Sequence, residues 1–148
     1  NELYAVSGER AVFLALTPGT GARELYSVHL DGSGLVRLHP ALPPFESCGV
    51  AGERDELFQI SPDGARVAFV DDLLADERFE LFTVPIDGSR PPRVRSDLLL
   101  ESSDVSDYSR PDFRFGPDGT LFFIADQEFE AVWELFAYRP GRAVQRVR

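Results

Sequence analysis

The sequence is poor in residues that carry thiol or metal chemistry: its 148 residues contain one cysteine, no methionine and two histidines. The single cysteine, Cys48, cannot form a disulfide within the chain, so the fold does not depend on an oxidising compartment. His29 and His39 lack the spacing that zinc sites and nucleophile–base pairs show, and we expect both to be structural or surface residues. No run of eighteen apolar residues occurs, so no membrane span is expected.

Lysine is absent as well, and 15 arginines stand against 25 aspartates and glutamates, which gives a formal net charge of −10. A field of this sign repels phosphate backbones, so no nucleic-acid partner is expected, whereas a basic protein partner would suit it. Solubility is the alternative explanation for the charge. Hydrophobic residues make up 43% of the chain and include twelve phenylalanines, which indicates a folded, β-rich protein.

A strand–turn–strand pattern occurs three times in the chain. Residues 58–70 contain two apolar stretches joined by Pro-Asp-Gly, residues 113–124 repeat this pattern, and residues 4–14 form a shorter copy. Each copy is followed by a third strand that begins Glu-Leu-Tyr or Glu-Leu-Phe, at residues 24–30, 80–86 and 134–138, and then by a turn and a fourth strand. We therefore divide one domain into three blades at residues 1–40, 57–96 and 111–148, with long loops at 41–56 and 97–110.

Apolar residues fall on both faces of these strands. Phe82 and Leu81 must point to opposite faces of the second blade, and the neighbours Phe122 and Phe123 must do the same in the third. A sheet that is apolar on both faces is covered on both faces. The predicted fold is therefore all-β, a β-propeller with three four-stranded antiparallel blades in the chain. A two-sheet sandwich, which would leave one polar face on each strand, is the alternative.

The Ser-Pro-Asp-Gly and Val-Ala-Phe sequences of residues 61–69, with Glu-Leu-Phe and Ile-Asp-Gly-Ser in residues 80–89, resemble blades of TolB-type β-propellers. Similar blades occur in the propellers of dipeptidyl-peptidase, prolyl-oligopeptidase-like and tricorn proteases. The resemblance covers all three blades and implies a periplasmic or secreted location, but such motifs specify a blade better than a function. The Gly-x-Ser-x-Gly sequence of the serine-peptidase site that accompanies the protease propellers is absent.

The resemblance implies a ring of more than three blades, because members of this family commonly have six or seven, and three blades are half of a six-bladed ring. An open arc of three blades would expose two apolar sheet faces, which soluble monomers rarely do. Two copies of the arc would form a six-bladed ring with two-fold symmetry. We therefore expect a second copy of the chain to close the ring, and the competing possibility is that the chain is half of a longer protein.

Strand connectivity gathers the long loops at one end of the propeller. In a four-stranded meander the first and third turns share one end, here called the tight-turn end, and the remaining connections share the other, here called the loop end. The tight turns contain Asp31, Asp63 and Asp87, which backbone geometry explains. The loop end is acidic, and the candidate ligand- or partner-binding residues there are Glu53, Asp55, Glu56, Asp71, Asp72, Asp104, Asp107 and Asp126.

The predicted function is a non-catalytic binding or scaffold module that engages a ligand or protein partner through the loop end. The alternatives are a hydrolase or lyase that uses carboxylates near the ring axis, and a set of blades that only spaces or gates another domain. An enzyme would show acids converging in a pocket with raised pKa values, whereas a binding module would show them spread and solvated.

No catalytic residue, metal or cofactor is assigned from the sequence. Calcium is the alternative, with donors from Asp71, Asp72 and Asp76 or from the oxygen-rich residues 102–107. Neutralising Asp104 or Asp107 is expected to change the free energy of unfolding by no more than about 0.5 kcal/mol each.

Overall fold

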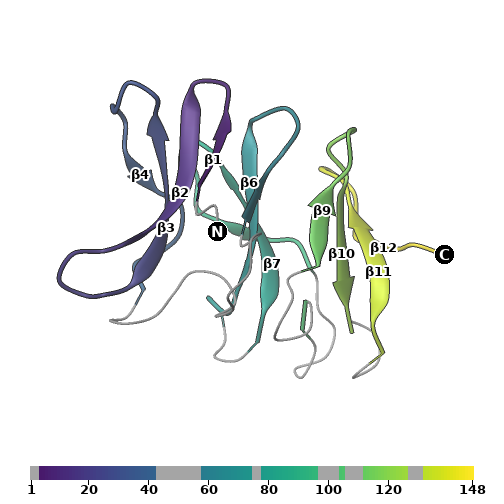
Figure 1. The fold of residues 1–148 in the computed structure, drawn as a ribbon. Coiled ribbons are helices and arrows are strands. Elements are labelled where there is room, and N and C mark those ends of the chain that lie inside the picture. Colours follow the sequence, from purple (N-terminus) through teal and green to yellow (C-terminus); the bar gives the residue numbers. More distant parts are fainter. Residues whose placement is uncertain (1–3, 43–57, 75–77, 97–103, 106–111, 127–131) are drawn as a thin grey trace.

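Three four-stranded antiparallel sheets lie side by side in chain order in the structure, a computed structural model (Figure 1). The structure describes residues 4–42, 58–74, 78–96, 104–105, 112–126 and 132–148. Within these ranges no helix suited to crossing a membrane occurs. This arrangement confirms the predicted all-β fold with three four-stranded blades.

Each sheet is a meander in which strands that follow one another in the chain pair with one another. The first sheet consists of β1 (Tyr4–Ser7), β2 (Arg10–Leu16), β3 (Arg23–His29) and β4 (Val36–Arg37). The second consists of β5 (Phe58–Ile60), β6 (Arg66–Asp71), β7 (Glu80–Pro85) and β8 (Arg93–Val94). The third consists of β9 (Phe113–Phe115), β10 (Leu121–Ala125), β11 (Glu134–Tyr138) and β12 (Gln145–Arg146).

Aspartate side chains close the tight turns. In each case Oδ1 accepts a hydrogen bond from the backbone N–H two residues further on, which is the turn chemistry that favours aspartate. The pairs are Asp31 with Ser33 (2.8 Å), Asp63 with Ala65 (3.1 Å), Asp87 with Ser89 (3.0 Å) and Asp118 with Thr120 (3.0 Å). The backbone explanation predicted for Asp31, Asp63 and Asp87 is therefore confirmed, and Asp118 shows the same bond.

Two hydrophobic clusters join the sheets, one on each face of the second sheet. In one, aliphatic side chains of the first sheet pack against Phe69 and Phe82 of the second. In the other, Leu81 and its neighbours pack against Phe123 and Phe136 of the third sheet. The two phenylalanine pairs stack with ring centroids 5.5 and 5.7 Å apart. Each interface thus joins an aliphatic face to an aromatic face, and Phe82 and Leu81 point to opposite faces as predicted.

The first strands of the sheets lie along one side of the arc, where β1 contacts β5 and β5 contacts β9. Gln59 of β5 bridges the second and third sheets at this side. Its Nε2 donates to the carbonyl oxygen of Phe113 at 2.9 Å, and its Oε1 accepts the N–H of Phe115 at 3.2 Å. One amide side chain therefore continues the hydrogen-bonded ladder from one blade to the next.

Among the described residues, no further sheet packs on the outer face of the first sheet or of the third. On the first, Phe13 and Tyr26 stack at 5.8 Å, the same pair that is buried in the other two blades, and both are only half-buried. Tyr4 beside them is 59% exposed. On the third, Leu135 is 40% exposed and Phe122 is half-buried. The predicted pair of open apolar faces is therefore present in the chain.

Candidate functional site

The loop end carries the candidate acids, of which Asp71, Asp72, Asp104 and Asp126 lie within the described residues. Asp71 and Asp126 are buried, whereas Asp72 and Asp104 are half-buried. The remaining candidates, Glu53, Asp55, Glu56 and Asp107, lie outside the described residues. The structure therefore describes four of the eight candidate residues.

Asp104 and Asp126 meet between the second and third sheets. The N–H of Asp104 donates to Oδ1 of Asp126 at 2.7 Å, and the N–H of Asp126 donates to the carbonyl oxygen of Asp104 at 3.3 Å. On the other side, Oδ1 of Asp104 accepts the N–H of Phe79 at 2.8 Å, and Val105 donates its N–H to the Phe79 carbonyl oxygen at 2.8 Å. Residues 104 and 105 thus link the loop before β7 to the end of β10.

This contact shifts the acidity of Asp104. Burial raises the pKa of its carboxyl above the ordinary value, the nearby Asp126 charge acts in the same direction, and the hydrogen bond from Phe79 opposes both. Asp71, opposite Glu80 in the ladder, uses its Oδ1 to accept the N–H of Asp72 at 2.8 Å. Three of the four described candidate acids therefore accept hydrogen bonds from backbone N–H groups.

We predict different outcomes for two substitutions of Asp104. Asp104→Ala should lower the free energy of unfolding by about 1–3 kcal/mol, because the Phe79 N–H loses its acceptor. Asp104→Asn retains an acceptor oxygen and removes the repulsion from Asp126. For this variant we therefore keep the prediction that the free energy of unfolding changes by no more than about 0.5 kcal/mol. Urea unfolding of both variants measures the difference, and an equal loss in both would show that the charge matters rather than the acceptor.

The raised pKa of Asp104 also gives the sign of a pH effect. The folded state binds this proton more tightly than the unfolded state, so the contribution of Asp104 to stability falls as the pH rises from about 3.9 through the folded pKa. Asp104→Asn should lack this part of the pH dependence.

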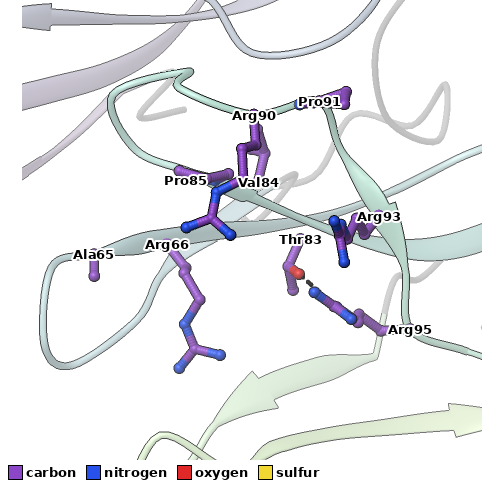
Figure 2. Close-up of a pocket in the computed structure, with 9 residues that line it drawn as sticks. All are labelled: Ala65, Arg66, Thr83, Val84, Pro85, Arg90, Pro91, Arg93 and Arg95. Carbon is purple, nitrogen blue, oxygen red and sulfur yellow. Dashed lines mark hydrogen bonds between the residues drawn. The ribbon is translucent and has the colours of Figure 1, made fainter. Parts of the chain in front are cut away.

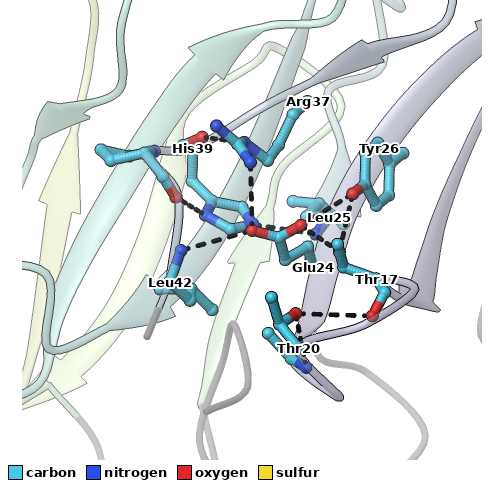
Figure 3. A network of polar contacts seen from close by, with 10 residues as sticks. Thr17, Thr20, Glu24, Leu25, Tyr26, Arg37, His39 and Leu42 are labelled. Carbon is cyan, nitrogen blue, oxygen red and sulfur yellow. Dashed lines mark hydrogen bonds and ion pairs between the residues drawn. The ribbon is translucent and has the colours of Figure 1, made fainter. Parts of the chain in front are cut away.

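A second carboxylate at the loop end, Glu24, is only 2% exposed (Figure 3). Its Oε2 accepts hydrogen bonds from the hydroxyl groups of Thr17 and of Tyr26, the latter at 2.7 Å. Its Oε1 accepts from Nη1 of Arg37 and from the N–H of Leu42, both at 3.3 Å. Burial alone would raise the Glu24 pKa, but these bonds and the Arg37 charge together hold it below the ordinary value. Glu24 therefore ties the chain that leaves β4 to the start of β3.

His39, also buried, completes this network. The N–H of Leu25 donates to its Nε2 at 3.0 Å, so Nδ1 carries the proton and donates to the carbonyl oxygen of Pro40 at 2.5 Å. In the second sheet Ser96 takes the same place, because its Oγ accepts the N–H of Leu81 at 3.1 Å. His39 is therefore structural, one of the two predicted alternatives, and the first and second sheets both place a hydrogen-bond acceptor at this position.

We predict that His39 makes the protein sensitive to mild acid. Burial lowers its pKa, so the neutral form contributes stability that is present above pH about 6.5 and is lost as the pH falls through the folded value. His39→Ser retains an acceptor and cannot titrate in this range. The variant should lose less stability than the wild type between pH about 7.5 and about 5.5, as urea midpoints can measure. An unchanged pH slope would contradict this role of His39.

The recurring glutamate that begins each third strand has a structural role that was not predicted from the sequence. Glu24, Glu80 and Glu134 all face a residue in or just after the fourth strand of the same sheet: Arg37 at 3.3 Å, Ser96 at 3.3 Å and Arg146 at 2.8 Å. The repeated Glu-Leu-Tyr and Glu-Leu-Phe sequences contained this signal. Among the residues described, no group of three or more aspartate, glutamate, histidine or cysteine side chains is placed to hold a metal ion.

No protein-family model matches the sequence, and no curated protein matches it. The fold is similar to that of TolB from Acinetobacter baumannii, with a TM-score of 0.54 and 16% identity over 93% of this chain and 29% of that one. It is also similar to a protein assigned as TolB from Agrobacterium tumefaciens, with a TM-score of 0.52 and 17% identity over 94% of this chain and 45% of that one. This chain spans less than half of either structure. It has the β-propeller fold of the TolB structures, and its three sheets form part of a propeller.

Proposed function

We propose that the chain is a non-catalytic binding module, and that its loop end engages a basic segment of a protein partner. The observation that carries this proposal is the bonding of the acids: Asp71, Asp104 and Asp126 each accept a backbone N–H, and Asp104 and Asp126 anchor an inter-blade connection. Carboxylates engaged in this way give the loop end a negative potential and a fixed shape. The likeness to TolB makes a periplasmic location part of the same proposal.

The raised pKa of Asp104, with Asp126 beside it, is the feature that a carboxylate-using hydrolase or lyase would share. Such an enzyme needs an acid free to exchange a proton with its substrate. Oδ1 of Asp104 already accepts the Phe79 N–H and Oδ1 of Asp126 accepts the Asp104 N–H. This pair therefore supports an anchoring role, and we propose binding rather than catalysis.

An arginine octapeptide is a suitable probe for a basic partner. Asp72→Asn removes one charge from the loop end, and Asp31→Asn removes one from an exposed tight turn while retaining its turn-closing oxygen. We expect Asp72→Asn to weaken binding of the peptide roughly threefold, a typical value for one charge pair at a protein surface, and Asp31→Asn to leave it unchanged. Equal weakening in both variants would show that the peptide is attracted by the net charge of the protein and not by the loop end.

We also propose that a second copy of the chain closes the ring. The open aromatic face of the first sheet has the same stacked pair, Phe13 with Tyr26, that each interior interface packs against an aliphatic face. The open face of the third sheet presents Phe122, Ile124 and Leu135 by strand alternation. The two open faces thus have the same complementary kinds of side chain as the two closed interfaces.

Light scattering after size exclusion tests this closure. The wild type is expected to have the mass of two chains, and Phe13→Glu, which places a charge on the open face, the mass of one chain with an unchanged circular dichroism spectrum. A well-folded wild-type monomer in dilute solution would refute the dimer and would leave the loop-end proposal to be judged by the peptide experiment.

A further inference from the structure

Figure 2 shows a hollow lined by arginines. It lies at the tight-turn end of the second sheet, beside the turn between β7 and β8. Its basic residues are Arg66 at the start of β6, Arg93 on β8, Arg95 just after it, and Arg90 in the turn between β7 and β8. Thr83 of β7 also lines the hollow, which has a volume of about 260 Å³. We call this site the arginine hollow.

The four positive charges are not neutralised within the described chain, since none of these arginines forms an ion pair with a described carboxylate. In the neighbouring turn, hydrogen bonds from Ser61 and Ala65 lower the pKa of Asp63, and the Arg66 charge acts in the same direction. Oδ1 of Asp63 already accepts both of these bonds, so Asp63 is not an ion-pair partner of Arg66. Burial lowers the pKa of Arg95, and the charges of Arg93 and Arg66 add to this effect while Tyr138 opposes it. The protein thus concentrates cations in one place although acids outnumber bases by 25 to 15 over the whole chain.

Two of the guanidinium groups are held in place by other side chains. Nε of Arg95 donates to Oγ1 of Thr83 at 2.7 Å, and its guanidinium lies 4.7 Å from the ring centroid of Tyr138. Arg66 lies 5.8 Å from the ring centroid of Phe115. These contacts use the faces of the guanidinium groups and one Nε, so most of the N–H donors remain available for an anion.

The other sheets use the equivalent positions differently. In the first sheet Arg10 stands where Arg66 stands, and its Nη1 donates to Nε2 of His29 at 2.8 Å. Pro85 replaces that histidine in the second sheet and offers Arg66 no acceptor. The third sheet has Thr120 at this position, where its hydroxyl accepts Nε of Arg139 at 2.9 Å. Among the described sheets, only the second has both an arginine on its second strand without a side-chain hydrogen bond (Arg66) and arginines in and just after its fourth strand (Arg93 and Arg95).

We propose that the arginine hollow binds a phosphomonoester, the phosphate ester of a small organic group. Guanidinium forks match the oxygens of a phosphate in pairs, and a doubly charged phosphate can use donors from several directions, as the arrangement of Arg90, Arg93 and Arg95 in Figure 2 allows. Pro85 and Pro91 supply an apolar wall beside these donors. That wall suits the organic part of an ester better than free phosphate, which has none.

Isothermal titration with phenyl phosphate and with inorganic phosphate tests the proposal at an ionic strength of about 0.15 M, where attraction by exposed distant charges is largely screened. We expect saturable binding of phenyl phosphate, about tenfold tighter than that of inorganic phosphate, because of the apolar wall. Arg93→Gln removes an exposed member of the hollow and should weaken phenyl phosphate binding about tenfold.

Arg142→Gln is the matched control, because Arg142 is an exposed arginine in the corresponding turn of the third sheet and does not line the hollow. It should leave the affinity unchanged. Absence of saturation with phenyl phosphate at millimolar concentration, or equal weakening by both variants, would overturn the site. Equal affinity for the two probes would overturn the assignment to an ester. The hollow belongs to one chain, so neither result depends on ring closure or on the loop end.

Discussion

Phe69→Ala is expected to lower the free energy of unfolding by about 3–5 kcal/mol, the largest loss among the single substitutions considered. Phe69 is fully buried, stacks on Phe82 with centroids 5.5 Å apart, and fills the interface between the first and second sheets. Removing its ring leaves a cavity between two sheets whose backbones are held by their own ladders, so the site cannot collapse easily. Urea unfolding of the purified variants measures the loss.

Phe13→Ala is the matched control, because Phe13 occupies the same register in the first sheet and stacks on Tyr26 at 5.8 Å on an open face. It is half-buried, so its loss in dilute solution should be about 1 kcal/mol. If a second copy covers this face, the loss should grow with protein concentration, because only the wild type gains from association. Equal losses for the two variants in dilute solution would contradict the assignment of Phe69 to an interior interface.

Glu24→Ala is expected to have the next largest effect, a loss of about 2–4 kcal/mol, because four donors lose one buried acceptor group. The donors are the hydroxyl groups of Thr17 and Tyr26, Nη1 of Arg37 and the backbone N–H of Leu42. The lowered pKa gives a second signature. The stability that ionised Glu24 contributes is present above pH about 4.3 and is lost as the pH falls through the folded value.

Glu134→Ala provides the comparison for Glu24→Ala. Glu134 begins the third strand of its sheet as Glu24 does, but it is half-buried and pairs with Arg146 at 2.8 Å. Its removal should cost no more than about 1 kcal/mol. Thermal and urea unfolding of both variants measure the difference. A loss for Glu134→Ala as large as that for Glu24→Ala would show that the recurring strand position, rather than the buried network, determines the effect.

The strands and their faces were predictable from the sequence because they depend on local rules. Alternation places Phe82 and Leu81 on opposite faces, and the Asp-Gly turn at Asp31 requires a short-range hydrogen bond, so both are visible in a few adjacent residues. The contact between Asp104 and Phe79 was not predictable in this way. It depends on where a long connection crosses between two sheets, and no periodic pattern encodes that position.

The arginine hollow was partly visible in the sequence. Arg90, Arg93 and Arg95 fall within six residues without an intervening acid, which is an unusual run for so acidic a chain. Arg66 joins them only through the pairing of β6 with β7, and its release depends on Pro85 standing where the first blade has His29. The net charge of the whole chain gives no sign of this group, because the surplus of acidic residues outweighs a local cluster of arginines.

The number of covered faces on each sheet has a consequence for amide hydrogen exchange. The middle sheet is covered on both sides, whereas each terminal sheet is covered on one, so the chain resembles a short linear array in which each unit is stabilised by its neighbours. Amides of β6 and β7 should exchange slowest, and opening should begin at either end and proceed inward. Each added neighbour would then slow exchange in the terminal sheet that it covers and leave the far end unaltered.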